Sequence, residues 1–95
     1  MQFSFMVGIT EPHRVDFSFD QFGGRLEIKV DGLPVVDEVR TLSVSLTKRY
    51  DFVVGLAEKH HVTIEKERKL LLAGIQPQQY RIFIDGQLVQ TYEGK

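Results

Sequence analysis

The side chains that could do chemistry in this chain are few and widely spaced. Histidine occurs only at positions 13, 60 and 61. Neighbouring side chains of a strand point to opposite faces, so His60 and His61 are poorly placed to bind one metal ion. Because cysteine is absent, a zinc site would need carboxylates at a spacing that this sequence does not indicate. We therefore expect surface histidines, with no metal site and no cofactor.

Covalent catalysis is not indicated either. A serine or threonine becomes a nucleophile only with a base beside it. Ser43 and Ser45 alternate with apolar residues, which is typical of the solvent face of a sheet, and no Gly-x-Ser-x-Gly elbow occurs. Asp31 and Asp85 each precede glycine and are explained by turn chemistry. We predict that the protein is not an enzyme.

The composition argues against two classes of partner. The chain has 12 Lys and Arg residues and 13 Asp and Glu residues, and its formal charge is −1. Nucleic-acid modules usually carry a basic surplus. The N-terminal residues lack the pattern of a signal peptide, and no apolar run approaches the roughly 20 residues that span a bilayer. We expect a cytoplasmic protein that binds neither nucleic acid nor membranes.

The elements that must position these side chains are strands. Apolar and polar residues alternate with a period of two, which is the mark of a strand with one buried face. The alternation predicts strands over 3–9, 14–19, 25–30 and 41–46, and we expect two further strands over 50–56 and 59–65. Four segments with this period are hard to reconcile with a helical protein.

Two turns predict hairpins. Asp31-Gly32 and Asp85-Gly86 each lie between apolar runs, which is the strongest short-range hairpin signal. A two-residue loop would place Val30 opposite Leu33 and Ile28 opposite Val35, and Ile82 opposite Val89. These two hairpins recur at an offset of 54 residues, which suggests two sheets built on a similar plan.

A third hairpin follows if residues 21–24 form a loop. Phe19 then lies opposite Leu26, and Phe17 opposite Ile28. On the other face Asp16 meets Lys29, and opposite charges across strands are mildly stabilising. One register therefore satisfies both faces.

Residues 65–73 leave two alternatives open. All of them are good helix formers, so they fit either a short helix or a charged turn leading into a strand; the β context favours the turn and strand. Altogether the 95 residues predict one domain, 1–95, with about eight strands. The predicted fold is all-β, an antiparallel β-sandwich of two sheets.

The order of several short blocks resembles one family. The chain is similar to a single lobe of the Fas apoptotic inhibitory molecule (FAIM) family across nearly its whole length. The blocks that carry the resemblance are His13-Arg14-Val15-Asp16-Phe17, Gly24-Arg25, Val30-Asp31-Gly32, Phe52-Val53-Val54-Gly55, Val62-Thr63-Ile64 and Tyr80-Arg81-Ile82-Phe83-Ile84-Asp85-Gly86 with Tyr92.

The resemblance implies a β-sandwich of two antiparallel sheets and a non-enzymatic protein. FAIM proteins are linked to the suppression of apoptosis and to limiting protein aggregation. This chain has one lobe, and Leu42 stands where the family commonly has Trp. We therefore carry over the fold and not the apoptotic role.

Apolar residues on an expected outer face give the most informative functional signal. Phe83 and Leu88 pair on the face away from Ile82, whereas the equivalent positions of the first hairpin are Lys29 and Pro34. Other elements of the chain, such as the strand over 3–9 or residues 70–72, could cover Phe83 and Leu88. Otherwise they form a patch for an unidentified protein partner or for self-association.

Two functional hypotheses follow. The first is a non-catalytic, chaperone-like or protein-interaction domain that binds through a sheet face or an edge strand. The second is a carrier of small apolar ligands with a cavity between the sheets, although the chain is short for a core with a large cavity.

Overall fold

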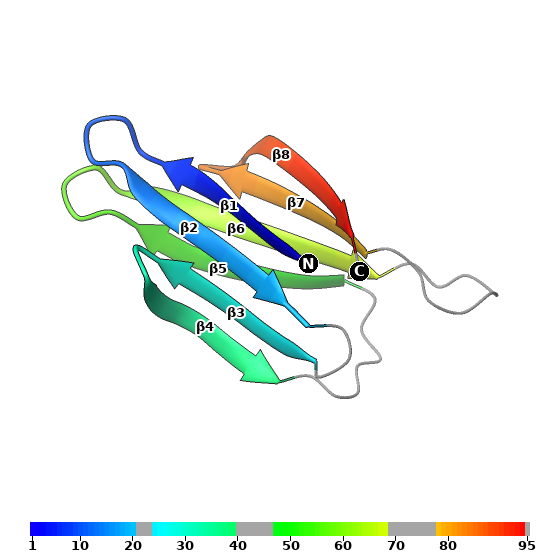
Figure 1. Cartoon of the computed structure of the whole chain (residues 1–95). Coiled ribbons are helices and arrows are strands. Elements are labelled where there is room, and N and C mark those ends of the chain that lie inside the picture. The colour runs from blue at the N-terminus through cyan, green and yellow to red at the C-terminus, as the bar shows by residue number, and fades with distance from the viewer. Residues whose placement is uncertain (21–23, 40–46, 69–77, 95) are drawn as a thin grey trace, which may run out of the picture. The chain divides into compact units, whose positions relative to one another are not determined.

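Eight strands make up the structure, a computed structural model that describes residues 1–20, 24–39, 47–68 and 78–94. Within these ranges every regular element is a strand, and the order of the strands follows the chain in each of two four-stranded sheets (Figure 1). The strands are β1 (Gln2–Val7), β2 (His13–Phe19), β3 (Arg25–Val30), β4 (Leu33–Val39), β5 (Thr47–Val54), β6 (His60–Arg68), β7 (Gln78–Ile84) and β8 (Gln87–Gly94).

The predicted fold class is confirmed. One sheet has the order β1-β2-β3-β4 and the other has the order β5-β6-β7-β8, with antiparallel pairs. The face-to-face packing that a sandwich adds stays a prediction. In the described ranges no helix is long and apolar enough to cross a membrane.

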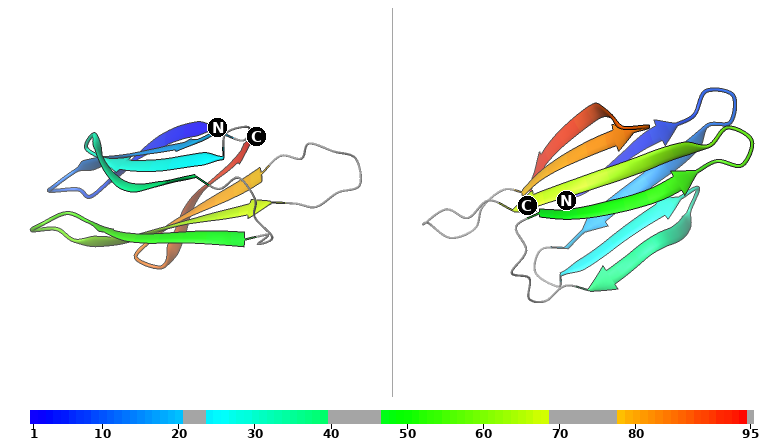
Figure 2. Two further views of the ribbon diagram at one scale, coloured as in Figure 1. Left: turned by 90° about the horizontal axis from the view of Figure 1, so that it is seen from below. Right: turned by 180° about the vertical axis from the view of Figure 1, so that it is seen from behind.

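The chain divides into two compact units. The first unit contains Met1–Ser43 and Val53–His60, that is, sheet β1–β4 with the tip of the β5–β6 hairpin. The second unit contains Val44–Phe52 and His61–Lys95, which hold most of the β5–β8 sheet. Figure 2 shows the strands of each sheet side by side from two further directions.

Burial in the first sheet follows the predicted alternation. Val15 and Phe17 of β2 are buried, and so are Leu26 and Ile28 of β3. The register between β2 and β3 is the predicted one, with Phe17 opposite Ile28. Phe3 of β1 also lies opposite Phe17, and their rings stack with centroids 4.6 Å apart. The apolar face of this sheet is therefore continuous across three strands.

The second sheet repeats this arrangement. Ile64 of β6 lies opposite Ile82 of β7, and both are fully buried. Tyr80, two residues before Ile82 on β7, is buried on the same face, and burial raises the pKa of its phenol. Arg81 and Phe83, which alternate with Tyr80 and Ile82 along β7, point to the opposite face and are only half-buried.

Both Asp-Gly hairpins form, but two predicted pairs are wrong. Asp31 and Asp85 have φ of 52°, and the glycines that follow are also at positive φ, as in a type I′ turn. Beyond each turn the register shifts by one residue, so Ile28 lies opposite Val36 and not Val35. Ile82 likewise lies opposite Gln90 and not Val89.

A β-bulge explains both errors. Val35 and Val89 are the extra residues of their strands, and a bulge places two residues opposite one. Both valines are exposed, as are most side chains of the two edge strands β4 and β8. A pattern of apolar residues alone does not reveal such an insertion.

Two predicted strands end earlier than the apolar pattern suggested. β1 ends at Val7 and β5 at Val54, so Ile9 and Leu56 lie in loops and are 92% and 86% exposed. The physical reason is the glycine that follows each valine. Gly55 has φ of 102°, and Gly8 has φ of 99°, a backbone region that side chains with a Cβ rarely adopt.

The alternatives for residues 65–73 are settled in part. Strand β6 continues through Glu65–Arg68, which excludes a helix there. Residues 69–73 lie outside the described residues, and so do the predicted strand over 41–46 and the loop residues 21–23.

The two sheets carry the same local features at constant offsets. The predicted recurrence of the hairpins at an offset of 54 residues extends to turn conformation and bulge position. A second recurrence has an offset of 47 residues and joins the loops β1–β2 and β5–β6. Its sequences are Val7-Gly8-Ile9-Thr10-Glu11-Pro12-His13 and Val54-Gly55-Leu56-Ala57-Glu58-Lys59-His60.

Candidate functional site

The predicted pair Phe83 and Leu88 lies on the second sheet. The two residues face each other across β7 and β8, as predicted. Phe83 is half-buried and Leu88 is 54% exposed. On β6, Thr63 lies opposite Phe83 on the same face. We call this surface, with Phe83, Leu88 and the pocket residues beside them, the Phe83 face.

A pocket of about 230 Å³ lies beside Phe83. Thr63 forms its inner wall and is 4% exposed. The pocket has the size of one or two side chains rather than that of a cofactor, because ligand pockets for drug-sized molecules run from about 300 to 1,000 Å³. Its lining residues are Arg49, His61, Thr63, Glu65, Phe83 and Gly86.

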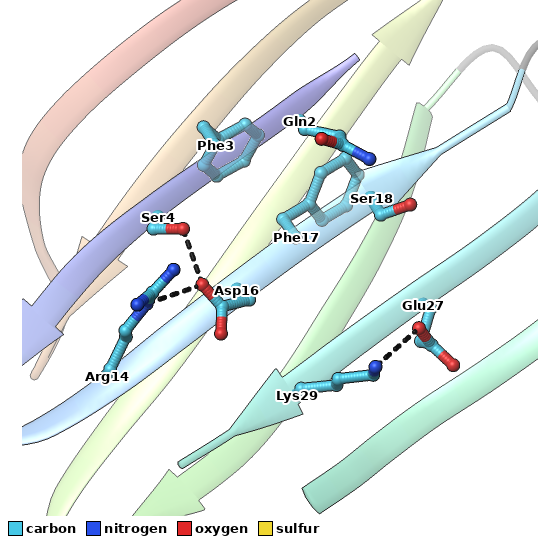
Figure 3. A pocket seen from close by; sticks show the side chains of 9 residues that line it. All are labelled: Gln2, Phe3, Ser4, Arg14, Asp16, Phe17, Ser18, Glu27 and Lys29. Carbon is cyan, nitrogen blue, oxygen red and sulfur yellow. Dashed lines mark hydrogen bonds and ion pairs between the residues drawn. The ribbon is translucent and has the colours of Figure 1, made fainter. Parts of the chain in front are cut away.

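The equivalent face of the first sheet is polar. A pocket of about 300 Å³ lies there, and Figure 3 shows the side chains that line it. Lys29 takes the place of Phe83 and pairs with Glu27 at 3.4 Å. Pro34 takes the place of Leu88, opposite Lys29. The two hairpins share turn, register and bulge, so an apolar pair at this position is not a requirement of the hairpin.

The charges on this polar face pair along strands more than across them. Arg14 donates to Asp16 two residues further along β2, at 2.8 Å, although Asp16 lies opposite Lys29 in the predicted register. Ser4 of β1 also donates its hydroxyl to Asp16 (Figure 3). These hydrogen bonds lower the pKa of Asp16, and the bond from Ser4 has the larger effect.

One hydroxyl group on each face donates its proton to a carboxylate. Thr63 donates to Asp51 at 2.6 Å, as Ser4 does to Asp16, so in both cases the hydroxyl proton points to a carboxylate. The hydroxyl of Thr63 lowers the pKa of Asp51, and a carboxylate with a lowered pKa is a weak base. His61 contacts the same Asp51 at 3.4 Å. The aspartate therefore lies between the hydroxyl of Thr63 and the imidazole of His61, and the imidazole is not placed to take the proton of the hydroxyl.

Two of the histidines form hydrogen bonds with carboxylates, which the sequence did not predict. His13 lies between Glu11, at 2.5 Å from Nε2, and Asp31, which contacts Nδ1. His60 contacts Glu58 through Nε2. His13 and His60 are half-buried, whereas His61 is exposed as expected.

Glu11 and Glu58 bind one another's loops. Glu58 accepts the backbone N–H groups of Ile9 and Thr10, the shortest at 2.7 Å, and the hydroxyl of Thr10 at 2.6 Å. In return Glu11 accepts the N–H groups of Leu56 at 2.7 Å and Ala57 at 2.8 Å. We call this reciprocal arrangement of residues 9–11 and 56–58 the loop clasp. Both loops lie within the first unit.

These bonds keep both glutamates ionised. The contact with His13, followed by the N–H groups of Ala57 and Leu56, lowers the pKa of Glu11 to about 2. The pKa of Glu58 is also far below its ordinary value, because the hydroxyl of Thr10 and then His60 stabilise the carboxylate. The glutamates of the clasp are thus occupied by the protein itself.

The carboxylates around His13 are not arranged as ligands of a single metal ion. The two carboxylates beside His13 meet different ring nitrogens, which lie on different sides of the imidazole. Among the described residues no group of three or more His, Asp or Glu side chains could hold a metal ion.

Comparison with family models, with curated proteins and with solved structures finds no match to this chain.

A repeat in the sequence marks the two loops of the clasp as equivalent. The motif Val-Gly-[Ile/Leu]-x-Glu-x-His occurs twice, at an offset of 47 residues. The Asp-Gly turns recur at an offset of 54 residues, which aligns the hairpins β3–β4 and β7–β8 but does not align these loops. Two glutamates at matching positions of a repeat are a signal of shared structure, although the sequence does not show that each binds the other's loop.

Proposed function

We propose that this chain is a non-catalytic protein-binding domain and that the Phe83 face is its binding surface. One observation carries the proposal. Phe83 and Leu88 lie opposite each other on a face where the matching hairpin of the first sheet has Lys29 and Pro34. Since the hairpin forms with either pair, the apolar pair is explained better by binding than by folding.

The surroundings of Phe83 suit a side chain of a protein partner. Leu88 and Phe83 supply apolar contact, and burying an aromatic or branched side chain against them is worth about 1.5–3 kcal/mol. The pocket beside them adds Arg49 and Thr63 as polar contacts at its wall. An apolar centre with a polar rim is typical of protein interfaces.

The face is a better binding surface than the edge of β8. The edge strand β8 has no charged residue over 87–92, whereas the edge strand β4 of the other sheet contains Pro34, Asp37 and Glu38. Charges and proline protect an edge from pairing with another chain. However, the bulge at Val89 interrupts regular pairing along β8. Side-chain contact with Phe83 and Leu88 therefore carries most of the binding.

A non-enzymatic role is supported by the state of the hydroxyl groups. Ser4 and Thr63 donate their hydroxyl protons to Asp16 and Asp51, and the lowered pKa of each aspartate makes it a weak base. The resemblance to the FAIM family also supports a non-catalytic domain, and its link to limiting aggregation supports a chaperone-like role. The carrier hypothesis gains no support, because both described pockets are lined mainly by polar side chains.

The test uses the first sheet as an internal control. The variant F83K/L88Q makes the Phe83 face resemble its polar counterpart, and K29Q/P34Q changes the matching positions of the first sheet. Light scattering after size exclusion measures self-association, and turbidity of a heated model protein measures suppression of aggregation.

We expect the wild-type chain to self-associate or to suppress aggregation. F83K/L88Q should lose the effect, and K29Q/P34Q should keep it. A wild-type chain that is strictly monomeric and leaves aggregation unchanged would contradict the proposal. So would equal activity of the wild-type chain and F83K/L88Q.

A further inference from the structure

His13 has an acidic partner on each ring nitrogen. Nε2 is 2.5 Å from Oε2 of Glu11 in the β1–β2 loop, and Nδ1 contacts Oδ2 of Asp31 in the β3–β4 turn. The imidazole is 20% exposed. These two carboxylates are the titratable groups that face the ring in the described part of the chain.

Only the protonated ring can satisfy both partners. Imidazolium has two N–H donors, whereas neutral imidazole has one donor and one lone pair. A neutral His13 would therefore turn a lone pair toward one of the carboxylates. Both of these are ionised, because Glu11 also accepts two N–H groups of the clasp and Asp31 accepts the N–H of Arg14 at 2.9 Å.

We propose that His13 is a pH-sensitive latch that, when protonated, ties the loop clasp to the β3–β4 turn, and that loosens the clasp when it loses its proton. In the protonated state it holds Glu11 in the position where that carboxylate accepts the N–H groups of Leu56 and Ala57. Loss of the proton removes one of the two ring bonds. In either case His13 no longer joins Glu11 to Asp31, and the clasp loses its tie to the β3–β4 turn.

The direction of the pH effect follows from the contacts. Asp31 and then Glu11 raise the pKa of His13 above its ordinary value of 6.5. Such a group stabilises the fold fully below its unfolded-state pKa, and this contribution is lost as the pH rises through the folded-state pKa. The clasp therefore tightens at mildly acidic pH and loosens on the alkaline side of the histidine range.

The released loops are those that carry exposed aliphatic side chains. Ile9 and Leu56 lie within the bonded segments of the clasp and are almost fully exposed. While the clasp is closed, both have a fixed backbone. Its opening changes their relative positions without any change in the buried apolar face, so the latch controls a surface and not the core.

Two measurements on the whole chain test the latch together. Nuclear magnetic resonance of the imidazole groups gives the titration of His13, and amide hydrogen exchange gives the protection of Leu56 and Ala57 across the same pH range. We expect both curves to share a midpoint above the ordinary histidine value. Protection of the two amides should fall about fivefold to tenfold across it, the loss of one modest hydrogen bond each.

Variants separate the latch from a general loss of stability. His13→Gln should give low protection of Leu56 and Ala57 at every pH, whereas His61→Gln, outside the clasp, should leave the protection of these two amides as it is in the wild type. If His13→Gln does not fold, Asp31→Asn serves instead. It keeps a turn residue that tolerates positive φ and removes one carboxylate, so the midpoint should move to lower pH.

Two results would overturn the latch. One is a His13 midpoint at or below the ordinary value in the wild-type chain. The other is protection of Leu56 and Ala57 that does not change as His13 titrates.

Discussion

Glu11 and Glu58 act on backbone rather than on ligands. Each carboxylate accepts N–H groups from the other loop, which would otherwise need water as a partner. Exposed carboxylates in a sequence usually indicate a solvated surface. Here their environment depends on a contact between residues 45 or more positions apart, which no local pattern reveals.

Acid should weaken the clasp through these carboxylates. Because the folded-state pKa of Glu11 is about 2 and its ordinary value is 4.5, its contribution to stability is present above 4.5 and is lost as the pH falls toward 2. Glu11→Gln should therefore lose less melting temperature over that interval than the wild type does. Calorimetry at a series of pH values measures this.

The control for the acid experiment is Asp37→Asn. Asp37 pairs with Arg25 on an exposed strand face and takes no part in the clasp. Its melting curve should follow the wild type through the acid range. If Glu11→Gln and the wild type lose melting temperature in parallel, Glu11 does not contribute in the way we describe.

Gly55 should be far less replaceable than Gly86. Both have positive φ, so Gly86→Ala should cost about 1–2 kcal/mol from backbone strain alone. A Cβ on Gly55 would also lie 2.0 Å from the carbonyl oxygen of Glu58, whereas one on Gly86 would meet nothing within 4 Å. Gly55→Ala should therefore lower the free energy of unfolding by about 1–3 kcal/mol more than Gly86→Ala does, which is the usual cost of overpacking.

Chemical denaturation of the two glycine variants gives the comparison directly. Equal free energies of unfolding would mean that the backbone approach of residues 55 and 58 is not as close as the structure has it.

At the scale of the element, alternation and Asp-Gly turns were sufficient for most of the fold. They predicted β2 and β3 with their register, because Phe17, Leu26 and Ile28 satisfy one buried face only in that pairing. They also gave the pairing of Phe83 with Leu88.

The prediction failed at bulges and at strand ends. Val35 and Val89 fit the apolar pattern but lie in bulges, whose position depends on the twist of the hairpin and not on hydrophobicity. Ile9 and Leu56 also fit the pattern, yet each follows a glycine that ends the strand. In both cases backbone geometry outweighed the side-chain pattern.

The buried face of the hairpin β3–β4 should be much more sensitive than its turn. Ile28 is fully buried on β3, so Ile28→Ala should cost about 2–5 kcal/mol of the free energy of unfolding. Leu33 is 71% exposed beside the turn, and Leu33→Ala should change it by less than about 0.5 kcal/mol. Urea denaturation measures both, and similar losses would contradict the assigned faces.

For the whole molecule, each sheet serves as a reference for the other, in the way that related proteins are usually compared. Two sheets share turns, bulges and loop motifs, so a residue that differs between matching positions is not needed for the shared geometry. Phe83 and Leu88 differ in this way from Lys29 and Pro34. The sequence predicted this pair as a patch, but the pocket beside it required the position of β5, which brings Arg49 to the same face.

The most direct test of the Phe83 face is an amide chemical-shift map with a permanently unfolded model protein as the added partner. We predict shifts confined to the Phe83 face, at Thr63, Phe83 and Leu88, with no change at Ser4, Asp16 and Lys29 on the matching polar face. Shifts of equal size on both faces, or at the polar face alone, would contradict the assignment of the binding surface.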